Sequence, residues 1–201
     1  VSKEDGSLEI TKATVTVSVA DAPDVEYDGA EHTGIETYTF TGIVSGQTAT
    51  ITYTAAKGTL VGTYTGSYGE DFQVKSGETD VTANYELTTK TPGKLQITDR
   101  SEKYEITLVA NSSTGNTYDG TEKSATGVET DKFTFNDVEY TVSNFTTSDP
   151  AETNAGTYAN TITAGEGGFI VKNAAGDDVT AQFTVSKEDG SLEITKATVT
   201  V

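Results

Sequence analysis

The chain has 201 residues, a formal net charge of −18, 34% hydrophobic residues, and no Cys, Met or Trp. So large an acidic excess repels nucleic-acid phosphates and anionic membrane surfaces, which excludes nucleic acid as a partner. The lack of Cys excludes disulfides, thiol nucleophiles and Cys-based zinc sites. No apolar run has membrane-spanning length, so we expect no membrane insertion, and the low hydrophobic fraction favours two small cores over one large core.

The first seventeen residues, VSKEDGSLEITKATVTV, occur again at Val185–Val201. A shared fold requires a similar pattern of apolar and polar residues but not identical residues, so this identity indicates duplication. The copies are offset by 185 − 1 = 184 positions, which predicts a longer array with a period of 184 residues. Residues 1–12 are then expected to be the terminal strand of a preceding, truncated module, either exposed or paired with a neighbouring molecule.

A second, degenerate duplication lies inside one period. VEYDGAEHTG at Val25 aligns with NTYDGTEKSATG at Asn116, VGTYTG at Val61 with AGTYAN at Ala155, and PGKLQITD at Pro92 with DGSLEITK at Asp189. The order is kept and the offset drifts slowly, which indicates short loop insertions. We therefore predict two homologous modules, residues 13–99 and residues 104–201, the latter including the first strand of the next repeat.

Short runs with a period of two follow one another along the first module. They are ATVTVSVA at residues 13–20, ETYTF at 36–40, TATITYT at 48–54, GTYTG at 62–66, NYELTT at 84–89 and KLQIT at 94–98. Clusters of Gly, Asp, Asn and Ser separate them, and no segment has a sustained helical period. An all-β fold follows, with an immunoglobulin-like β-sandwich in each module. A β-grasp fold is the alternative, although it needs a helix across the sheet. Tyr64 and Tyr158, in the GTY strands, are expected in the cores.

The junctions between modules contain no flexible linker. LEIT runs into ATVTV through the single residue Lys12, and LQIT is joined to YEITLVA by DRSEK at residues 99–103. Neither joint is rich in Gly, Ser or Pro. Modules arranged end to end as a stiff rod are therefore expected.

Four motifs recur in the same order in both modules: Y-D-G, [VA]-G-T-Y, D-V-T-x-[NQ]-[YF] and G-x-L-x-I-T. This series resembles the YDG/MBG-type tandem repeats of bacterial cell-surface adhesin-like proteins, as found in Gram-positive bacteria. The second module has Gln182-Phe183 where the first has Asn84-Tyr85, which keeps the aromatic residue and replaces the Asn. The resemblance implies an extracellular, wall-associated stalk or adhesive repeat whose partners are neighbouring repeats, and no enzymatic activity.

The YDG triplets, Tyr27-Asp28-Gly29 and Tyr118-Asp119-Gly120, have two interpretations. In the first, they are turns in which Asp bonds its own backbone, Gly takes a positive φ and Tyr packs at the rim of the core. In the second, an exposed Tyr contacts carbohydrate. We favour the turn, because Asp-Gly pairs are typical of turns.

Two further kinds of site have candidate residues. The acidic loops contain Asp80, Asp177 and Asp178, whose oxygens are candidate Ca²⁺ ligands, although no D-x-D-x-D-G loop is present. Lys75 and Lys172 occupy equivalent F-x-V-K positions, where a covalent cross-link to Asn or Asp would need a desolvated lysine. Alternation along the strand instead predicts that Lys75 faces water.

No arrangement of residues suggests catalysis. His32 is the single histidine, with Lys123 near its place in the second module, and neither a nucleophile elbow nor a phosphate loop occurs. We expect no enzyme and no cofactor beyond the candidate Ca²⁺. The leading hypothesis is a monomeric stalk that projects a distal binding domain. The alternative is that each repeat itself binds mucin glycans or a host matrix protein weakly, with avidity from repetition.

Overall fold

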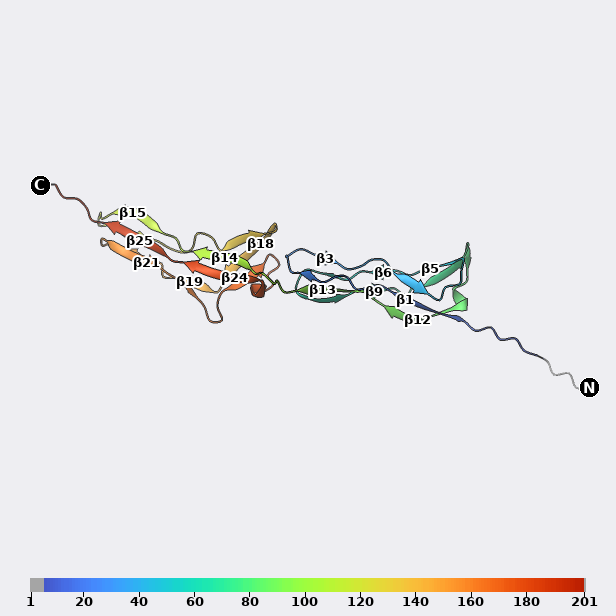
Figure 1. Cartoon of the computed structure of the whole chain (residues 1–201). Helices are drawn as coiled ribbons and strands as arrows, with labels where there is room; N and C mark the ends of the chain where they lie inside the picture. Colours follow the sequence, from blue (N-terminus) through green and yellow to red (C-terminus); the bar gives the residue numbers. More distant parts are fainter. Residues whose placement is uncertain (1–5, 201) are drawn as a thin grey trace, which may run out of the picture. The chain divides into compact units, whose positions relative to one another are not determined.

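A computed structural model describes residues 6–200, which form short β-strands with no α-helix among them (Figure 1). The all-β prediction is therefore confirmed. Contacts divide the chain into a first unit, Val1–Thr98, and a second unit, Asp99–Val201. The first five residues of the predicted terminal strand and Val201 lie outside the described residues.

The described residues of the first unit, 6–98, form thirteen strands and one 3₁₀ turn, Thr82–Asn84. The strands are β1 Ala13–Ser18, β2 Val25–Glu26, β3 His32–Thr33, β4 Thr39–Thr41, β5 Gln47–Thr50, β6 Tyr53–Thr54, β7 Lys57–Gly58, β8 Gly62–Thr65, β9 Ser67–Tyr68, β10 Gln73–Ser76, β11 Thr79–Asp80, β12 Tyr85–Thr91 and β13 Lys94–Thr98.

Residues 99–200 of the second unit form twelve strands and one 3₁₀ turn, Thr180–Gln182. The strands are β14 Tyr104–Val109, β15 Ser113–Thr117, β16 Lys123–Ser124, β17 Lys132–Phe135, β18 Val138–Ser143, β19 Phe145–Thr147, β20 Ala151–Glu152, β21 Gly156–Asn160, β22 Ile162–Ala164, β23 Ile170–Asn173, β24 Phe183–Glu188 and β25 Gly190–Thr195.

In both units the first part of the chain runs parallel to the last part. β1 pairs with β12 from Ala13↔Tyr85 onward, and β2 pairs with β13 up to Glu26↔Thr98. In the second unit β14 pairs with β24 and β15 with β25, again in parallel. Figure 1 shows β12 and β13 at opposite ends of the first unit, and β24 and β25 at opposite ends of the second.

A glycine lies at or just before the start of the last strand in each unit. A Cβ at Gly93 would lie 2.5 Å from the Ala20 carbonyl oxygen, and a Cβ at Gly190 would lie 2.3 Å from that of Asn111. No side chain fits so close to a neighbouring backbone, so both positions require Gly. In both modules this glycine precedes the buried Leu of the last strand, Leu95 or Leu192, by two residues, where the backbone that follows the first strand comes close.

The core of the first unit is formed where two three-stranded sheets meet. One sheet has the order β12-β1-β4 and the other β11-β10-β5. Val15 and Tyr85 from the first sheet pack with Val74 from the second, and Phe40 and Phe72 cover this cluster. Along β1 the alternation is followed: Val15 and Val17 are fully buried, as the period of two predicts.

The second unit has aromatic rings at the corresponding place. The Tyr104 ring lies 4.7 Å from that of Phe135, and the Tyr140 ring 4.8 Å from that of Phe183, between centroids. Toward the other end, Leu192 and Ile194 of β25 pack with Ala125, and Tyr158 lies against them. Each unit thus has apolar contacts along its length.

Both ends of the described chain lie outside these cores. Gly6–Lys12 and Lys196–Thr200 form no strand, and Leu8, Ile10 and Val199 are 88%, 86% and 84% exposed. The described part of the predicted terminal strand 1–12 is thus exposed and unpaired. Likewise, residues 197–200, predicted as the first strand of a next repeat, form no strand here.

Candidate functional site

The two YDG turns have the same backbone geometry. Asp28 Oδ1 accepts a hydrogen bond of 2.9 Å from the Ala30 amide, and Asp119 Oδ1 accepts one of 2.9 Å from the Thr121 amide. Gly29 has φ 86° and Gly120 has φ 79°, in the left-handed region. This is the arrangement that the turn interpretation expects.

A basic side chain lies beside each of these carboxylates. Lys123 Nζ donates to Asp119 Oδ2 at 2.8 Å, and His32 Nε2 lies 2.9 Å from Asp28 Oδ1. The bond from Lys123, with those from Thr121, holds the pKa of Asp119 well below its usual range. Partial burial raises the pKa of Asp28, but the Ala30 amide and His32 outweigh it, so the net pKa is lowered. The single histidine therefore acts as a turn partner.

The two YDG tyrosines differ, which the sequence did not indicate. Tyr27 is 1% exposed, whereas Tyr118 is 44% exposed, although the amide of each donates to the equivalent threonine carbonyl, Thr98 or Thr195. The two tyrosines thus have the same backbone hydrogen bond, but their rings lie in different environments. Tyr118 is the one ring among the strongly exposed large apolar side chains of the described residues.

Tyr64 and Tyr158, expected in the cores, are half-buried. The Tyr64 hydroxyl donates to the Leu60 carbonyl at 2.8 Å, and the Tyr158 hydroxyl donates to the Asn154 carbonyl at 3.2 Å. Each tyrosine bonds the backbone four residues before it. These bonds fix the loop that leads into the GTY strand and explain why the ring stops short of full burial.

Gln182 fastens the start of the second unit. Its side chain is buried, its Oε1 accepts a 3.0 Å hydrogen bond from the Arg100 amide, and its Nε2 donates to Asp99 Oδ1 at 2.6 Å. The Arg100 guanidinium carbon lies 3.9 Å from the centre of the Tyr104 ring, a cation–π distance, and Nε donates to the Glu102 carbonyl at 2.8 Å. The segment DRSEK is thereby held against the second unit.

The sequence alone did not predict this role of Gln182, although Gln182 replaces Asn84 in the alignment of the two modules. Asn84 stands where Gln182 stands in the second unit, and Asn84 is exposed. The longer amide side chain coincides with the longer junction of five residues, while Lys12 alone forms the short junction. This correlation between the length of the amide side chain and the length of the junction was the signal in the sequence that pointed to the role of Gln182. The contacts group Asp99 with the second unit, whereas the sequence analysis expected it at the end of the first module.

The candidate Ca²⁺ ligands bond to the protein itself. Asp80 Oδ1 accepts from the Thr82 amide at 2.8 Å, and Asp178 Oδ1 from the Thr180 amide at 3.0 Å, so each carboxylate bonds the first residue of the 3₁₀ turn that follows. Asp177 Oδ2 accepts from Asn173 Nδ2 at 3.1 Å. Within residues 6–200, no three or more His, Cys, Asp or Glu gather as metal ligands would.

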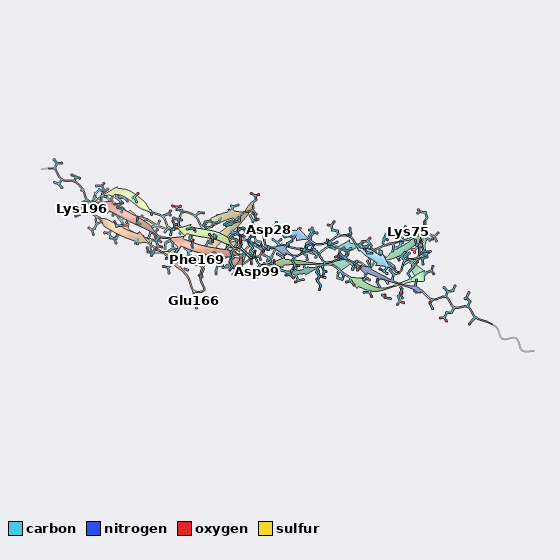
Figure 2. The ribbon with its side chains drawn as sticks, in the orientation of Figure 1. Asp28, Lys75, Asp99, Glu166, Phe169 and Lys196 are labelled. Carbon is cyan, nitrogen blue, oxygen red and sulfur yellow. The ribbon has the colours of Figure 1, made fainter. Side chains whose placement is uncertain are left out.

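The cross-link candidates are both exposed. Lys75 lies opposite Asp80 across the β10–β11 pair, and Lys172 forms an isolated bridge with Asp178. Figure 2 shows Lys75 at the end of the first unit far from Asp28. An amide cross-link needs a lysine withdrawn from water, and both lysines are exposed, so neither meets that requirement.

Comparisons with protein-family models, with curated proteins and with solved structures gave no match. The resemblance to YDG/MBG-type repeats therefore remains a prediction based on the order of four motifs. Nowhere in the described residues is there a helix long and apolar enough to cross a membrane.

Proposed function

We propose that this chain is a stalk repeat of a bacterial cell-surface adhesin, which holds a distal binding domain away from the cell. One observation carries the proposal: the first and last strands of each unit are parallel. Parallel strands point the same way, so the chain begins a unit at one end and leaves it at the other. Figure 2 places Asp99 and Lys196 at opposite ends of the second unit.

This topology suits units joined in series. The fourteen residues from Ala13 to Glu26 run beside the closing strands along the whole first unit. At ~3.3 Å per residue, such a path advances about 45 Å. An antiparallel pairing would return the chain to its starting end and would add little length per residue.

The link between the units supports stiffness. Thr98 accepts the Tyr27 amide at 3.0 Å within the first unit, and the next residue, Asp99, is bonded to Gln182 within the second. No unbonded residue therefore separates the two units, in contrast to a Gly/Ser linker. A short joint of this kind, without a Gly/Ser linker, is what the stalk proposal expects.

We further infer that each unit is an immunoglobulin-like sandwich. Two sheets contribute side chains to one cluster in the first unit, and the Tyr64 and Tyr158 hydroxyls bond backbone upstream of their strands, as a tyrosine corner does. A β-grasp fold would need a helix across the sheet, and residues 6–200 form only two 3₁₀ turns. Together with the motif order, these features support an extracellular, non-enzymatic module.

Adhesion by the repeat itself remains a second candidate, because Tyr118 is exposed. A ring at a turn can stack on a sugar, and repetition would multiply weak contacts. Chains with two and four periods should be tested for binding to immobilised mucin and to matrix proteins, together with their Tyr118→Ala variants. The stalk proposal expects no binding from either length. Binding that rises steeply with length and falls with Tyr118→Ala would replace it with the adhesive function.

A further inference from the structure

The opening and closing strands of each unit decide how the unit carries tension. A load along the chain enters the first unit at β1 and leaves it at the end of β13, and it enters the second unit at β14 and leaves it at the end of β25. Because β12 and β13 run parallel to β1 and β2, and β24 and β25 to β14 and β15, pulling these points apart slides each strand along its neighbour. Such a load strains all the hydrogen bonds of a ladder together, whereas a load at one end breaks them one after another.

Each opening strand is also bonded on its other side. β1 pairs with the antiparallel β4 through three residue pairs. At the end of β14, the Glu129 amide donates to the Val109 carbonyl at 2.9 Å. Just beyond it, the Asn111 amide donates to the Gly127 carbonyl at 3.0 Å. Both units have this second support, so the parallel ladders decide which unit is stronger.

The parallel ladder where the load enters is more regular in the second unit. β14 and β24 pair at six successive residues without a register shift. β1 and β12 also pair at six residues, but the register shifts between Val15 and Thr16, where the Thr88 hydroxyl donates to the Val15 carbonyl at 3.2 Å. A bulge of this kind disrupts the ladder locally. The entry ladder of the first unit is therefore weaker against sliding.

The strand through which the load leaves is held over more residue pairs in the second unit. β25 pairs with β15 at three positions and with β21 at five. β13 pairs with β2 at two positions and with β8 at four. The register of β15 and β25 shifts once, and within this shift Asn116 Nδ2 donates to the Glu193 carbonyl at 3.0 Å. A pull on the end of β25 is thus shared among more bonds than a pull on the end of β13.

A side chain at the entry point adds to this difference. Gln182, the residue before β24, accepts a hydrogen bond from the Arg100 amide at 3.0 Å and donates one to Asp99 Oδ1 at 2.6 Å. A load that enters at these two residues therefore passes directly to the start of β24, before β14 begins to slide. Asn84, the residue before β12, is exposed.

We propose that the two units are load-bearing elements of unequal strength, in which tension along the chain shears the parallel ladders and the first unit yields before the second. The inference rests on the stalk proposal, because a unit receives such a load when it lies in series between a cell and a distal domain. The first unit has 98 − 13 + 1 = 86 residues from β1 to β13. At ~3.6 Å per residue it yields about 310 Å of extended chain, while the second unit keeps its fold.

The direction of pulling tests the shear. The chain has no Cys, so introduced cysteines are unique attachment points for force spectroscopy on single full-length chains. Lys12 and Asn84 are exposed and precede Ala13 and Tyr85, which pair at the start of β1 and β12. A pull on Lys12→Cys/Asn84→Cys unzips this ladder, whereas a pull on cysteines added to the two ends of the chain shears it. The first unit should yield at a several-fold lower force when unzipped.

The second unit provides the matched pair. Lys103→Cys/Ala181→Cys places both handles at the starting ends of β14 and β24, on exposed positions. It should likewise yield at a lower force than in the end-to-end pull. Both double variants should keep the thermal midpoints of the parent, which shows that the fold is intact. An equal yield force in the two directions would overturn the proposal.

The end-to-end pull also tests the order of the two events. The second unit has 195 − 99 + 1 = 97 residues up to the end of β25, so its step is longer by about 40 Å at ~3.6 Å per residue. The shorter step should come first. Gln182→Ala removes two hydrogen bonds and should shorten the lifetime of the second unit under constant force about tenfold, whereas the control Asn84→Ala should change neither lifetime. A longer step that comes first, or an unchanged lifetime in Gln182→Ala, would refute the unequal strength.

Failure of this proposal is distinguishable from failure of the stalk proposal. Scattering from chains of increasing length measures extension without load, and force spectroscopy measures strength. Equal increments of length combined with yield forces that do not depend on direction would keep the stalk and reject the load-bearing role.

Discussion

Leu192 and Leu8 lie in identical sequence contexts and differ only in burial, which allows a test of the core with an internal control. Leu192→Ala removes a fully buried side chain that packs with Ile194 and Ala125. Such truncations cost about 2–5 kcal/mol of unfolding free energy. For a unit of this size, the midpoint should fall by about 10–30 °C. Leu8→Ala truncates an 88% exposed side chain and should stay within about 0.5 kcal/mol of the parent.

The assay is urea unfolding followed by amide NMR signals, which report the two units separately. Leu192→Ala should lower the urea midpoint of the second unit and leave the first unchanged. Comparable losses from Leu8→Ala and Leu192→Ala would mean that the amino-terminal copy is also packed in a core. A loss below about 0.5 kcal/mol from Leu192→Ala would refute the placement of β25.

Three more outcomes follow. Gln182→Ala should increase the nanosecond mobility of residues 99–103 in amide relaxation, because Asp99 and Arg100 lose a buried partner, whereas Asn84→Ala should change nothing; equal effects would refute the clamp. In the folded chain, bonds from Lys123 and Thr180 lower the pKa of Asp119 and of Asp178, respectively. The stabilisation from these bonds is therefore present above the ordinary carboxyl pKa of about 4 and is lost as the pH falls below it. A urea midpoint that rises as the pH is lowered from 5 to about 2 would contradict this. Millimolar Ca²⁺ should leave both thermal midpoints unchanged relative to a chelator, because the candidate carboxylates already bond to amides; a shift of several degrees would reveal a site.

The alternation of apolar and polar residues predicted those strands that have one buried face. ATVTVSVA has a period of two, and its first two buried positions, Val15 and Val17, are fully enclosed. TATITYT is broken instead into β5 and β6, because Thr52 turns to Asp71, whose Oδ1 accepts the Thr52 amide at 2.9 Å. The period of a sequence reports which face is buried and carries no information about a distant partner.

Contacts between residues far apart in the sequence could not be predicted, because the period of a strand does not identify its partner. The parallel pairing of β1 with β12 joins residues about seventy apart, and no sequence period encodes it. The unequal burial of Tyr27 and Tyr118 depends on surroundings that identical triplets do not specify. Gln182 is the intermediate case: its difference from Asn84 is visible in the alignment, but its partners Asp99 and Arg100 are recognisable only in space.

Small-angle scattering on chains with one, two and four periods of 184 residues tests the stalk most directly. Each period contains two units, and each unit advances about 45 Å along its parallel strands. The maximum dimension should therefore increase by a constant amount of at least about 90 Å per added period. A dimension that grows as the square root of the number of periods, as for freely jointed units, would contradict the stalk.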